Sequence, residues 1–294
     1  MLDAIEKADV LLEAIHWIRK FRGQVIVVKL GGSLMKDPLA MSHLLEDIVF
    51  METVGAKPIL VHGGGPAINR ALIESGIEPR FVMGRRFTCE KTLKIVEKVL
   101  VNELNEQIVE QLIILGGRAQ PLNFNTTNVV FGEPLTARDE NGNPVDFGFV
   151  GDATHIETDP ILDLLDRNTI PVIPSMCMSK TGQKLNVNAD TVATVVARTF
   201  LAEKLIFLSD VNGVRRDKDD PSTLIPTLTA KMAREMFASG AIVAGMIPKV
   251  QACLDTIHHG VQKVHIVDGS IRHALLLEIF TTEGVGTEII AGRE

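Results

Sequence analysis

Short apolar runs alternate along most of the chain with longer stretches in which apolar residues recur every three or four positions. The apolar runs predict β-strands at 24–29, 58–62, 170–174, 204–209 and 263–267. The longer stretches predict helices at 39–54, 66–76, 90–115, 188–202, 228–239, 247–259 and 272–280. The strands are rich in Val, Ile and Leu and lack alternating polar residues, which is typical of parallel strands covered by helices on both faces. The pattern therefore predicts an α/β protein with a mainly parallel sheet.

Residues 4–20 form a further predicted helix, ahead of the first strand. Apolar side chains recur along it at spacings of three and four residues and so share one face: Ala4, Ala8, Leu11, Leu12, Ile15 and Ile18. A helix outside the order of the sheet must bury that face, either on its own domain or on a second subunit. The pattern alone leaves both possibilities open.

Residues 120–150 break the alternation of strands and helices. Asn141-Gly142-Asn143-Pro144 is a turn signal between short extended pieces, and it predicts a β-hairpin insertion or lid. Lys180-Thr181-Gly182-Gln183 predicts the turn of a second hairpin. We place a domain boundary near residue 185, which divides the chain after its first helix into lobes at 22–185 and 186–294.

Composition narrows the class of protein. The chain has 294 residues, 46% of them hydrophobic, which is enough for one large domain or two modest ones. Its formal net charge of −7 argues against binding to nucleic acid or to an anionic membrane, because both need a cationic surface. Acidic residues among the first twenty argue against a signal peptide, and no apolar stretch reaches the roughly 18 residues that cross a bilayer. We therefore expect a soluble protein of the cytoplasm.

The cysteines support the same compartment. Cys89, Cys177 and Cys253 lie far apart in the sequence, with no CxxC pair and no histidine beside them. They offer neither a disulfide framework nor a zinc site, and no other metal-ligating cluster is expected. Each is best interpreted as a small hydrophobic residue.

Two glycine turns are the strongest chemical signal. Lys29-Leu30-Gly31-Gly32-Ser33 ends the first predicted strand, and His62-Gly63-Gly64-Gly65-Pro66 ends the second. Glycine lets backbone N–H groups approach phosphate oxygens, and each following helix directs its positive end to the same place. A cation at Lys29 can neutralise charge on a phosphoryl group in transfer, although a strand-end lysine can also reach solvent. The pair of turns favours phosphoryl-transfer chemistry.

Two other segments could bind an anionic substrate. Arg86 follows Gly84 and Arg85 in a predicted loop, and its guanidinium suits a carboxylate, although an isolated basic pair is more often solvated. Asn186-Val187-Asn188-Ala189-Asp190 opens the helix at 188–202. Asn and Asp are good N-cap residues, but these side chains could also hold a substrate or orient nearby lysines.

Two segments in the second half suit a nucleotide. Asp210-Val211-Asn212-Gly213-Val214 follows the strand at 204–209, where an acid and a glycine turn fit a nucleotide pocket, although an ordinary turn would look similar. Gly245-Met246-Ile247-Pro248-Lys249 opens another helix with proline in its first turn. Lys249 opposes the dipole of that helix, which indicates a bound anion.

Two common nucleotide-binding motifs are absent. A dinucleotide fingerprint starting at Gly63 would need a third glycine where Ile68 stands, and no strand ending in an acid follows at the distance of a ribose partner. The sequence G-x-x-x-x-G-K-[ST] of P-loop enzymes does not occur either. An NAD-dependent oxidoreductase and a P-loop enzyme are therefore disfavoured.

In order and spacing, these motifs resemble the amino acid kinase family, and within it the members that phosphorylate N-acetyl-L-glutamate. The resemblance covers nearly the whole chain and rests on Lys29-Leu-Gly-Gly, His62-Gly-Gly-Gly-Pro, Gly84-Arg-Arg, Asn186-Val-Asn-Ala-Asp190, Asp210-Val-Asn-Gly-Val, Gly245-Met-Ile-Pro-Lys249 and His265-Ile-Val-Asp-Gly. It implies an open, mainly parallel eight-stranded sheet between helix layers, with an acyl amino acid on the first lobe and ATP on the second. The implied reaction phosphorylates the γ-carboxylate, in arginine biosynthesis.

The resemblance also implies a role for each matching residue. Lys29 and Lys249 would stabilise the moving phosphoryl group, and Asp190 would hold both lysines in place. The acceptor would be bound by Gly32, Gly64, Gly65, Arg86 and Asn186, with Arg86 on its α-carboxylate. The nucleotide would be bound by Asp210, Val211, Asn212, Gly213, Val214, Arg215, Ala241, Ile242 and Val243, with Mg²⁺ bridging its phosphates.

The N-terminal helix resembles the extension of arginine-inhibited members, in which such helices join dimers into a hexameric ring. In that case L-arginine would bind beside this helix, at Trp17, His265, Glu278, Gly284 and Gly286. Two alternatives stay open. The acceptor could be another N-blocked amino acid such as N-acyl-α-aminoadipate, since one methylene changes binding by only ~1–3 kcal/mol. The chain could also be a non-catalytic arginine sensor, although Lys29, Asp190 and Lys249 speak against that.

Overall fold

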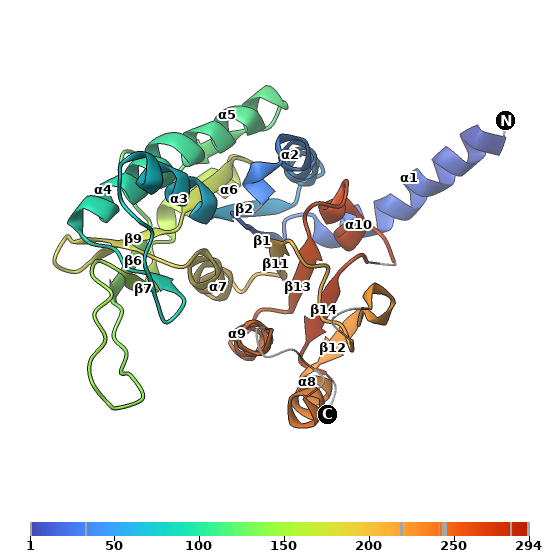
Figure 1. Ribbon diagram of the computed structural model, residues 1–294. Coiled ribbons are helices and arrows are strands. Elements are labelled where there is room, and N and C mark those ends of the chain that lie inside the picture. The colour runs from blue at the N-terminus through green and yellow to red at the C-terminus, as the bar shows by residue number, and fades with distance from the viewer. Residues whose placement is uncertain are drawn as a thin grey trace.

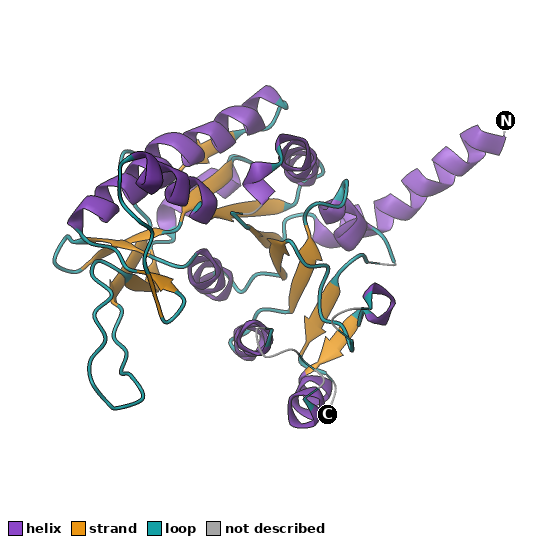
Figure 2. Ribbon diagram, viewed as in Figure 1, coloured by secondary structure: helices purple, strands orange, loops and turns teal. Residues whose placement is uncertain are grey.

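The centre of the protein is an eight-stranded sheet in the order β12-β14-β13-β11-β1-β2-β8-β5 (Figures 1 and 2). The computed structural model describes residues 2–32, 34–217, 220–240, 242, 246–282 and 284–292. Neighbouring strands run parallel except β13 and β14. The strands are β1 Val25–Leu30, β2 Lys57–His62, β5 Ala119–Pro121, β8 Ile170–Pro174, β11 Lys204–Ser209, β12 Thr227–Thr229, β13 Lys263–Asp268 and β14 Thr287–Ile290. The expectation of a mainly parallel α/β sheet is confirmed.

Helices cover both faces of this sheet, as Figure 1 shows. Successive residues of β1 point to opposite sides: Val27 joins a core with α6, α7 and α9, whereas Ile26 and Val28 join a core with α2, α5 and α10. Burial on both sides explains why the strands are unbroken apolar runs. The helices are α2 Pro38–Thr53, α3 Gly65–Glu74, α4 Glu90–Glu97, α5 Glu106–Ile114, α6 Asp159–Asp166, α7 Ala189–Thr199, α8 Ala230–Ser239, α9 Ile247–His258 and α10 Ala274–Phe280.

The predicted single helix at 90–115 is divided. Lys98–Asn105 forms a π-helical segment between α4 and α5. The extra residue per turn rotates the subsequent side chains about the helix axis, and π-segments occur frequently at functional sites. Here the segment carries Leu100 and Leu104 against Gly64 of the second glycine turn.

Both predicted hairpins are present in a four-stranded sheet of order β10-β9-β6-β7. β6 Val130–Pro134 and β7 Gly151–Ile156 pair antiparallel around the turn at 141–144, and β9 Met176–Ser179 pairs with β10 Lys184–Asn186 around Gly182. A further hairpin was not predicted: β3 Phe81–Val82 and β4 Arg85–Arg86 pair only with each other. Met83 and Gly84 both have positive φ, at 46° and 74°, which is the signature of a two-residue type I′ turn.

The first helix, α1 Leu2–Phe21, projects from the body of the molecule (Figure 1). Its last turns are anchored, because Trp17 stacks on Phe21 and the Phe21 ring meets Phe280 of α10 edge-on. Further out, Leu11 and Leu12 are 67% and 64% exposed. Among the described side chains of the predicted apolar face, Ile18 near the C-terminal end packs against the core, whereas Leu11, Leu12 and Ile15 are exposed. Within the described part of the chain, no helix combines the length and the apolar character needed to cross a membrane.

Candidate active site

The two glycine turns lie against each other at the carboxyl ends of β1 and β2. The N–H of Gly63 donates a hydrogen bond to the carbonyl oxygen of Leu30, 3.4 Å away. A Cβ atom at Gly32 would lie 2.8 Å from Pro66 Cδ and 3.0 Å from the nitrogen of Gly65. Only glycine permits so close an approach. Helix α3 begins directly at Gly65, so its positive end adds to the same place.

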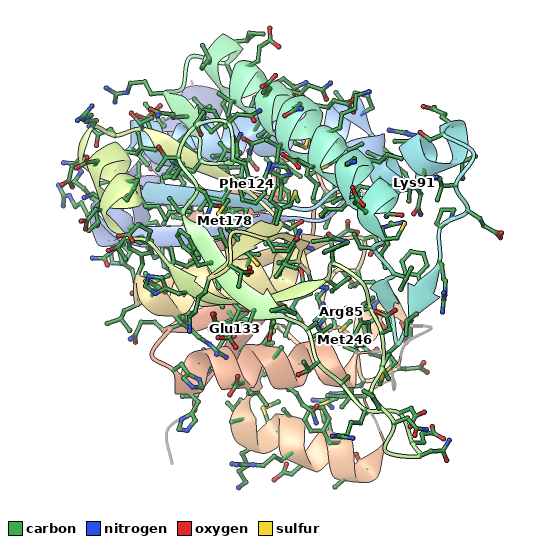
Figure 3. The ribbon with its side chains drawn as sticks, turned by 90° about the vertical axis from the view of Figure 1, so that its left-hand side faces the viewer. Arg85, Lys91, Phe124, Glu133, Met178 and Met246 are labelled. Carbon is green, nitrogen blue, oxygen red and sulfur yellow. The ribbon has the colours of Figure 1, made fainter. Side chains whose placement is uncertain are left out.

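These turns form one wall of a cavity of about 270 Å³. The opposite walls come from the β3–β4 hairpin and from the start of α7. Figure 3 views the molecule from the side on which Arg85 of the hairpin and Met246, next to the start of α9, are labelled. The lining includes every residue expected to bind the acceptor, together with two of the expected catalytic residues: Lys29, Gly32, Gly64, Gly65, Arg86, Asn186 and Asp190.

Lys29 and Asp190 form an ion pair at the inner end of this cavity. Lys29 Nζ lies 2.8 Å from Asp190 Oδ1, and the lysine side chain is only 12% exposed. The two residues meet because β11, which leads out of α7, is hydrogen-bonded to β1. Asn188 is the N-cap of α7, since its Oδ1 accepts hydrogen bonds from the N–H groups of Asp190 and Thr191. The cap interpretation is therefore correct for Asn188, and it fixes Asp190 in the first turn.

Lys249 completes a cluster of three charges. It lies in the first turn of α9 and lines a second cavity. Burial lowers the pKa of Lys249, the charge of Asp190 opposes that shift, and the charge of Lys29 adds to it. The charges of Asp190 and Lys29 therefore lie near enough to Lys249 to affect its pKa.

Arg86 places a guanidinium at the wall of the first cavity, and one edge of this guanidinium is available to a ligand. Its Nη2 donates to the carbonyl oxygen of Gly65 at 3.3 Å, and its Cζ lies 4.9 Å from the centre of the Phe81 ring. Nη1 is buried and has no partner among the described residues. Burial also lowers the pKa of Arg86. A buried guanidinium edge without a partner fits a carboxylate ligand.

Asn186 lies beside this arginine and is itself oriented. Its Nδ2 donates to the hydroxyl of Thr88 at 3.1 Å, and that hydroxyl donates to the carbonyl oxygen of Arg86 at 2.9 Å. The hydrogen bonds leave the amide oxygen of Asn186 available to a ligand. Sequence reasoning did not single out Thr88.

The second cavity, of about 610 Å³, is lined by Lys249 and by the predicted nucleotide segment. Gly213 has φ +128°, and a Cβ there would lie 2.3 Å from Thr287 Oγ1, so the turn requires glycine. Ala241 and Val243 fall outside the described residues. Asp268, at the end of β13, also lines this cavity and was not among the predicted nucleotide-binding residues. The full lining is Asp210, Val211, Asn212, Gly213, Val214, Arg215, Ile242, Met246, Lys249 and Asp268.

A third cavity, of about 520 Å³, brings together the residues expected to bind arginine: Trp17, His265, Glu278, Gly284 and Gly286. His265 Nδ1 lies 2.6 Å from Glu278 Oε1. Although burial raises it, hydrogen bonds from His265 and from the N–H groups of Gly286 and Val285 hold the pKa of Glu278 below its ordinary value. A Cβ at Gly284 would lie 2.6 Å from Glu278 Oε2, so a larger residue there would displace this buried carboxylate.

Four charged residues of the third cavity were missed: Lys20, Lys204, Lys263 and Glu288. Lys204, at the start of β11, is 5% exposed, and burial lowers its pKa to about 8. Its Nζ lies 2.8 Å from His265 Nε2. Glu288 on β14 also lines the cavity. For Lys204, the signal in the sequence was a lysine at the first position of an apolar strand.

A buried polar network supports the second glycine turn from behind. His62 Nδ1 lies 3.0 Å from the carbonyl oxygen of Gly63, and His62 Nε2 lies 2.9 Å from Asn105 Nδ2. Asn105 also donates to Val172 at 3.1 Å and accepts from Asn123 at 2.8 Å. Because the Nδ2 group of Asn105 can only donate, His62 is neutral with its proton on Nδ1. The π-helical segment is what brings Asn105 to this histidine.

This network predicts a loss of stability in acid. Burial lowers the pKa of His62 to about 4, from 6.5 in an unfolded chain. Between these values the unfolded chain binds a proton that the folded chain does not, so stability falls as pH drops below 6.5. At pH 5 the cost is about 2 kcal/mol. We expect the Tm advantage of the wild type over His62→Gln to shrink by roughly 4 °C between pH 7.5 and pH 5. A Tm difference that is constant across this range would contradict the prediction.

Comparison with known proteins adds an independent line of evidence. A model of the amino acid kinase family matches residues 24–268. The chain is 43% identical to an acetylglutamate kinase of Symbiobacterium thermophilum over 98% of each chain, and 42% identical to one of Methanocaldococcus jannaschii over 98% of each. A crystal structure of N-acetylglutamate synthase from Neisseria gonorrhoeae, complexed with coenzyme A and N-acetyl-glutamate, superimposes with a TM-score of 0.85 at 24% identity. That match covers 98% of this chain and 64% of the synthase, and it shows a shared fold.

Proposed function

The chain belongs to the amino acid kinase family and, within it, to the acetylglutamate kinases, and we propose that it transfers the γ-phosphoryl group of ATP to the γ-carboxylate of N-acetyl-L-glutamate. The product is the acyl phosphate N-acetylglutamyl 5-phosphate, used in arginine biosynthesis. The observation that carries the proposal is the cluster of Lys29, Asp190 and Lys249, which lies where the first and second cavities meet. We also propose the reducing cytoplasm as its location, in keeping with cysteines that lie far apart in the sequence.

The acceptor fills the first cavity. Arg86 binds its α-carboxylate through the unpartnered Nη1, and Asn186 accepts a hydrogen bond from its acyl amide. The γ-carboxylate then lies at the inner end, beside Lys29 and the backbone N–H groups of Gly32, Gly64 and Gly65. We assign residues 22–185 mainly to binding of the acceptor and residues 186–294 mainly to binding of ATP. Residues 1–21 are assigned to assembly of the oligomer.

Catalysis needs alignment and charge neutralisation but no general base, because a carboxylate is already a nucleophile at pH 7. One carboxylate oxygen attacks the γ-phosphorus in line with the bond to the leaving β-phosphate oxygen. Lys29 faces the phosphoryl group from the acceptor side and Lys249 from the nucleotide side. Asp190 holds both ammonium groups, so that their charges meet the phosphoryl oxygens as the transfer proceeds.

ATP occupies the second cavity, with its base and ribose along the segment Asp210–Arg215. Mg²⁺ would be held beside Asp210 and Asp268 together with the ATP phosphates, and it would supply additional positive charge there. The described residues contain no cluster of three metal-ligating side chains. Mg²⁺ keeps several waters and binds mainly through substrate phosphates with one or two carboxylates. Asp210 and Asp268 are the carboxylates that line this cavity.

The test is ADP release from ATP–Mg²⁺ with N-acetyl-L-glutamate as acceptor. We expect turnover with this acceptor and, from the usual value of one methylene in a pocket, about tenfold lower kcat/KM with N-acetyl-L-α-aminoadipate. A preference for the longer acceptor would support the homologous kinase, and no turnover with either acceptor would favour a non-catalytic sensor. A thermal shift by ATP–Mg²⁺ but not by NAD would separate both from an oxidoreductase.

L-Arginine is proposed as an inhibitor that binds in the third cavity. The carboxylates of Glu278 and Glu288 line it and suit a guanidinium, and the ammonium groups of Lys20 and Lys204 suit an α-carboxylate. Trp17 brings α1 into the same wall. Inhibition would then be a coupling between two distinct sites, which predicts that ATP-dependent turnover falls when arginine is added.

The exposed face of α1 supports a ring of six subunits in which these helices pair. Deletion of residues 1–20 is expected to reduce the mass in solution from a hexamer to a dimer and to weaken inhibition by arginine. The exchange of Leu11 and Leu12 for glutamine, which keeps the helix but removes two strongly exposed apolar side chains, should do the same. Light scattering measures the mass, and an unchanged mass in both variants would refute the hexamer.

A further inference from the structure

The first cavity carries more positive charge than the assigned residues use. Its lining contains three cations, Lys29, Arg85 and Arg86, and one carboxylate, Asp190, which leaves two positive charges. Lys29 is already paired with Asp190. The two uncompensated charges are therefore the neighbouring arginines of strand β4. A nearby like charge disfavours the charged form of each arginine, and a bound anion would favour it.

The guanidinium of Arg85 is free within the described part of the chain. None of the described residues forms a hydrogen bond or an ion pair with it. Its neighbours in the hairpin are engaged: the Arg80 guanidinium lies 4.7 Å from the centre of the Phe87 ring, and Arg86 packs on Phe81 and Gly65. The half-buried Arg85 is thus held at the cavity wall by the type I′ turn rather than by contacts of its own guanidinium.

We propose that Arg85 is a second guanidinium for the α-carboxylate of the acceptor, and that it makes the cavity selective for dianionic acceptors. A carboxylate offers about four lone-pair positions, and one guanidinium fork fills two of them. Arg86 binds from the buried side, where one of its nitrogens is already committed to Gly65. Arg85 binds the remaining lone pairs from the hairpin. This inference rests on the proposed function, since it refines how the same acceptor is recognised.

Removal of the Arg85 fork should affect acceptor binding alone. Arg85→Gln should raise KM for N-acetyl-L-glutamate by about tenfold, as expected for loss of a charge-assisted hydrogen bond at a half-buried site. The values of kcat and of KM for ATP should change less than twofold. Arg85→Lys, which keeps the charge but not the fork, should recover part of the affinity. Arg70→Gln, an exposed charge removal on α3 outside the cavity lining, should change neither constant.

The α-amide of N-acetyl-L-glutamate makes the test specific. It keeps the γ-carboxylate that reacts but lacks the group assigned to Arg85. We expect Arg85→Gln to change kcat/KM for this amide less than twofold. An equal loss with both acceptors, or a fall in kcat at constant KM, would overturn the inference. Absence of turnover in the wild type would refute the proposed function instead, and calorimetric binding of the two acceptors to wild type and Arg85→Gln would then decide on Arg85.

Discussion

Replacement of Lys249 by methionine is expected to lower kcat by about 10²- to 10³-fold, the usual cost of removing one group that stabilises developing charge in a closed site. The Tm should not fall, because burial already lowers the pKa of Lys249 and so disfavours its charged form. KM for N-acetyl-L-glutamate should stay within threefold, since Lys249 lines the nucleotide cavity and not the acceptor cavity. The result would place Lys249 in the transfer step.

The matched control is Lys91→Met. Lys91 is exposed on α4 and lines none of the three cavities, so its loss removes the same charge without touching the site (Figure 3). Initial rates of ADP release at saturating ATP and acceptor give kcat for both variants. A Lys249→Met enzyme that keeps more than a third of wild-type kcat would show that Lys29 and the glycine turns suffice. In that case the role assigned to Lys249 is wrong.

Local sequence pattern was sufficient for the elements that carry the glycine turns. The unbroken apolar runs at β1 and β2 predicted buried parallel strands. The second glycine turn opens a helix, α3, as predicted, whereas the first is followed by a 3₁₀ turn at Leu34–Lys36 and α2 begins only at Pro38. The same reasoning placed Asn188 and Asp190 at the start of α7. It could not show that Asp190 reaches Lys29, because that contact depends on β11 lying beside β1, and strand order is not encoded in any local window.

The sequence pattern missed helix α6 and strands β5, β12 and β14 of the main sheet, besides the β3–β4 hairpin and the π-helical segment. Strands β3 and β4 have two residues each, too few to show a period, and Met83 takes a positive φ without being a turn-forming residue. The π-helical segment keeps an apolar pattern that looks like an α-helix, so its effect on Asn105 is visible only in three dimensions. The grouping of the third cavity came from the resemblance to a family, since nothing local links Trp17 to Glu278.

The site depends on the close approach of the first glycine turn to the second. The sequence suggests this contact, but its distance comes only from the structure. Gly32→Ala would place a methyl group 2.8 Å from the rigid ring of Pro66 and 3.0 Å from the nitrogen of Gly65. Ordinary contact requires nearly 1 Å more, so the two turns must separate by about that amount. A displacement of about 1 Å in a catalytic alignment can cost 10²-fold.

We therefore expect Gly32→Ala to lower kcat/KM by about 10²-fold or more, in the same assay of ADP release. Gly117→Ala is the matched control: it crowds Val49 at 2.7 Å, outside the lining of the cavities, and should lower the Tm while kcat is kept. The double variant Gly32→Ala, Pro66→Ala removes the closest clashing atom and should recover at least part of the rate relative to Pro66→Ala alone. If Gly32→Ala kept its activity, the two turns would not act as one phosphate cradle, and the backbone N–H groups of Gly32 and Gly65 would have to be removed from the mechanism.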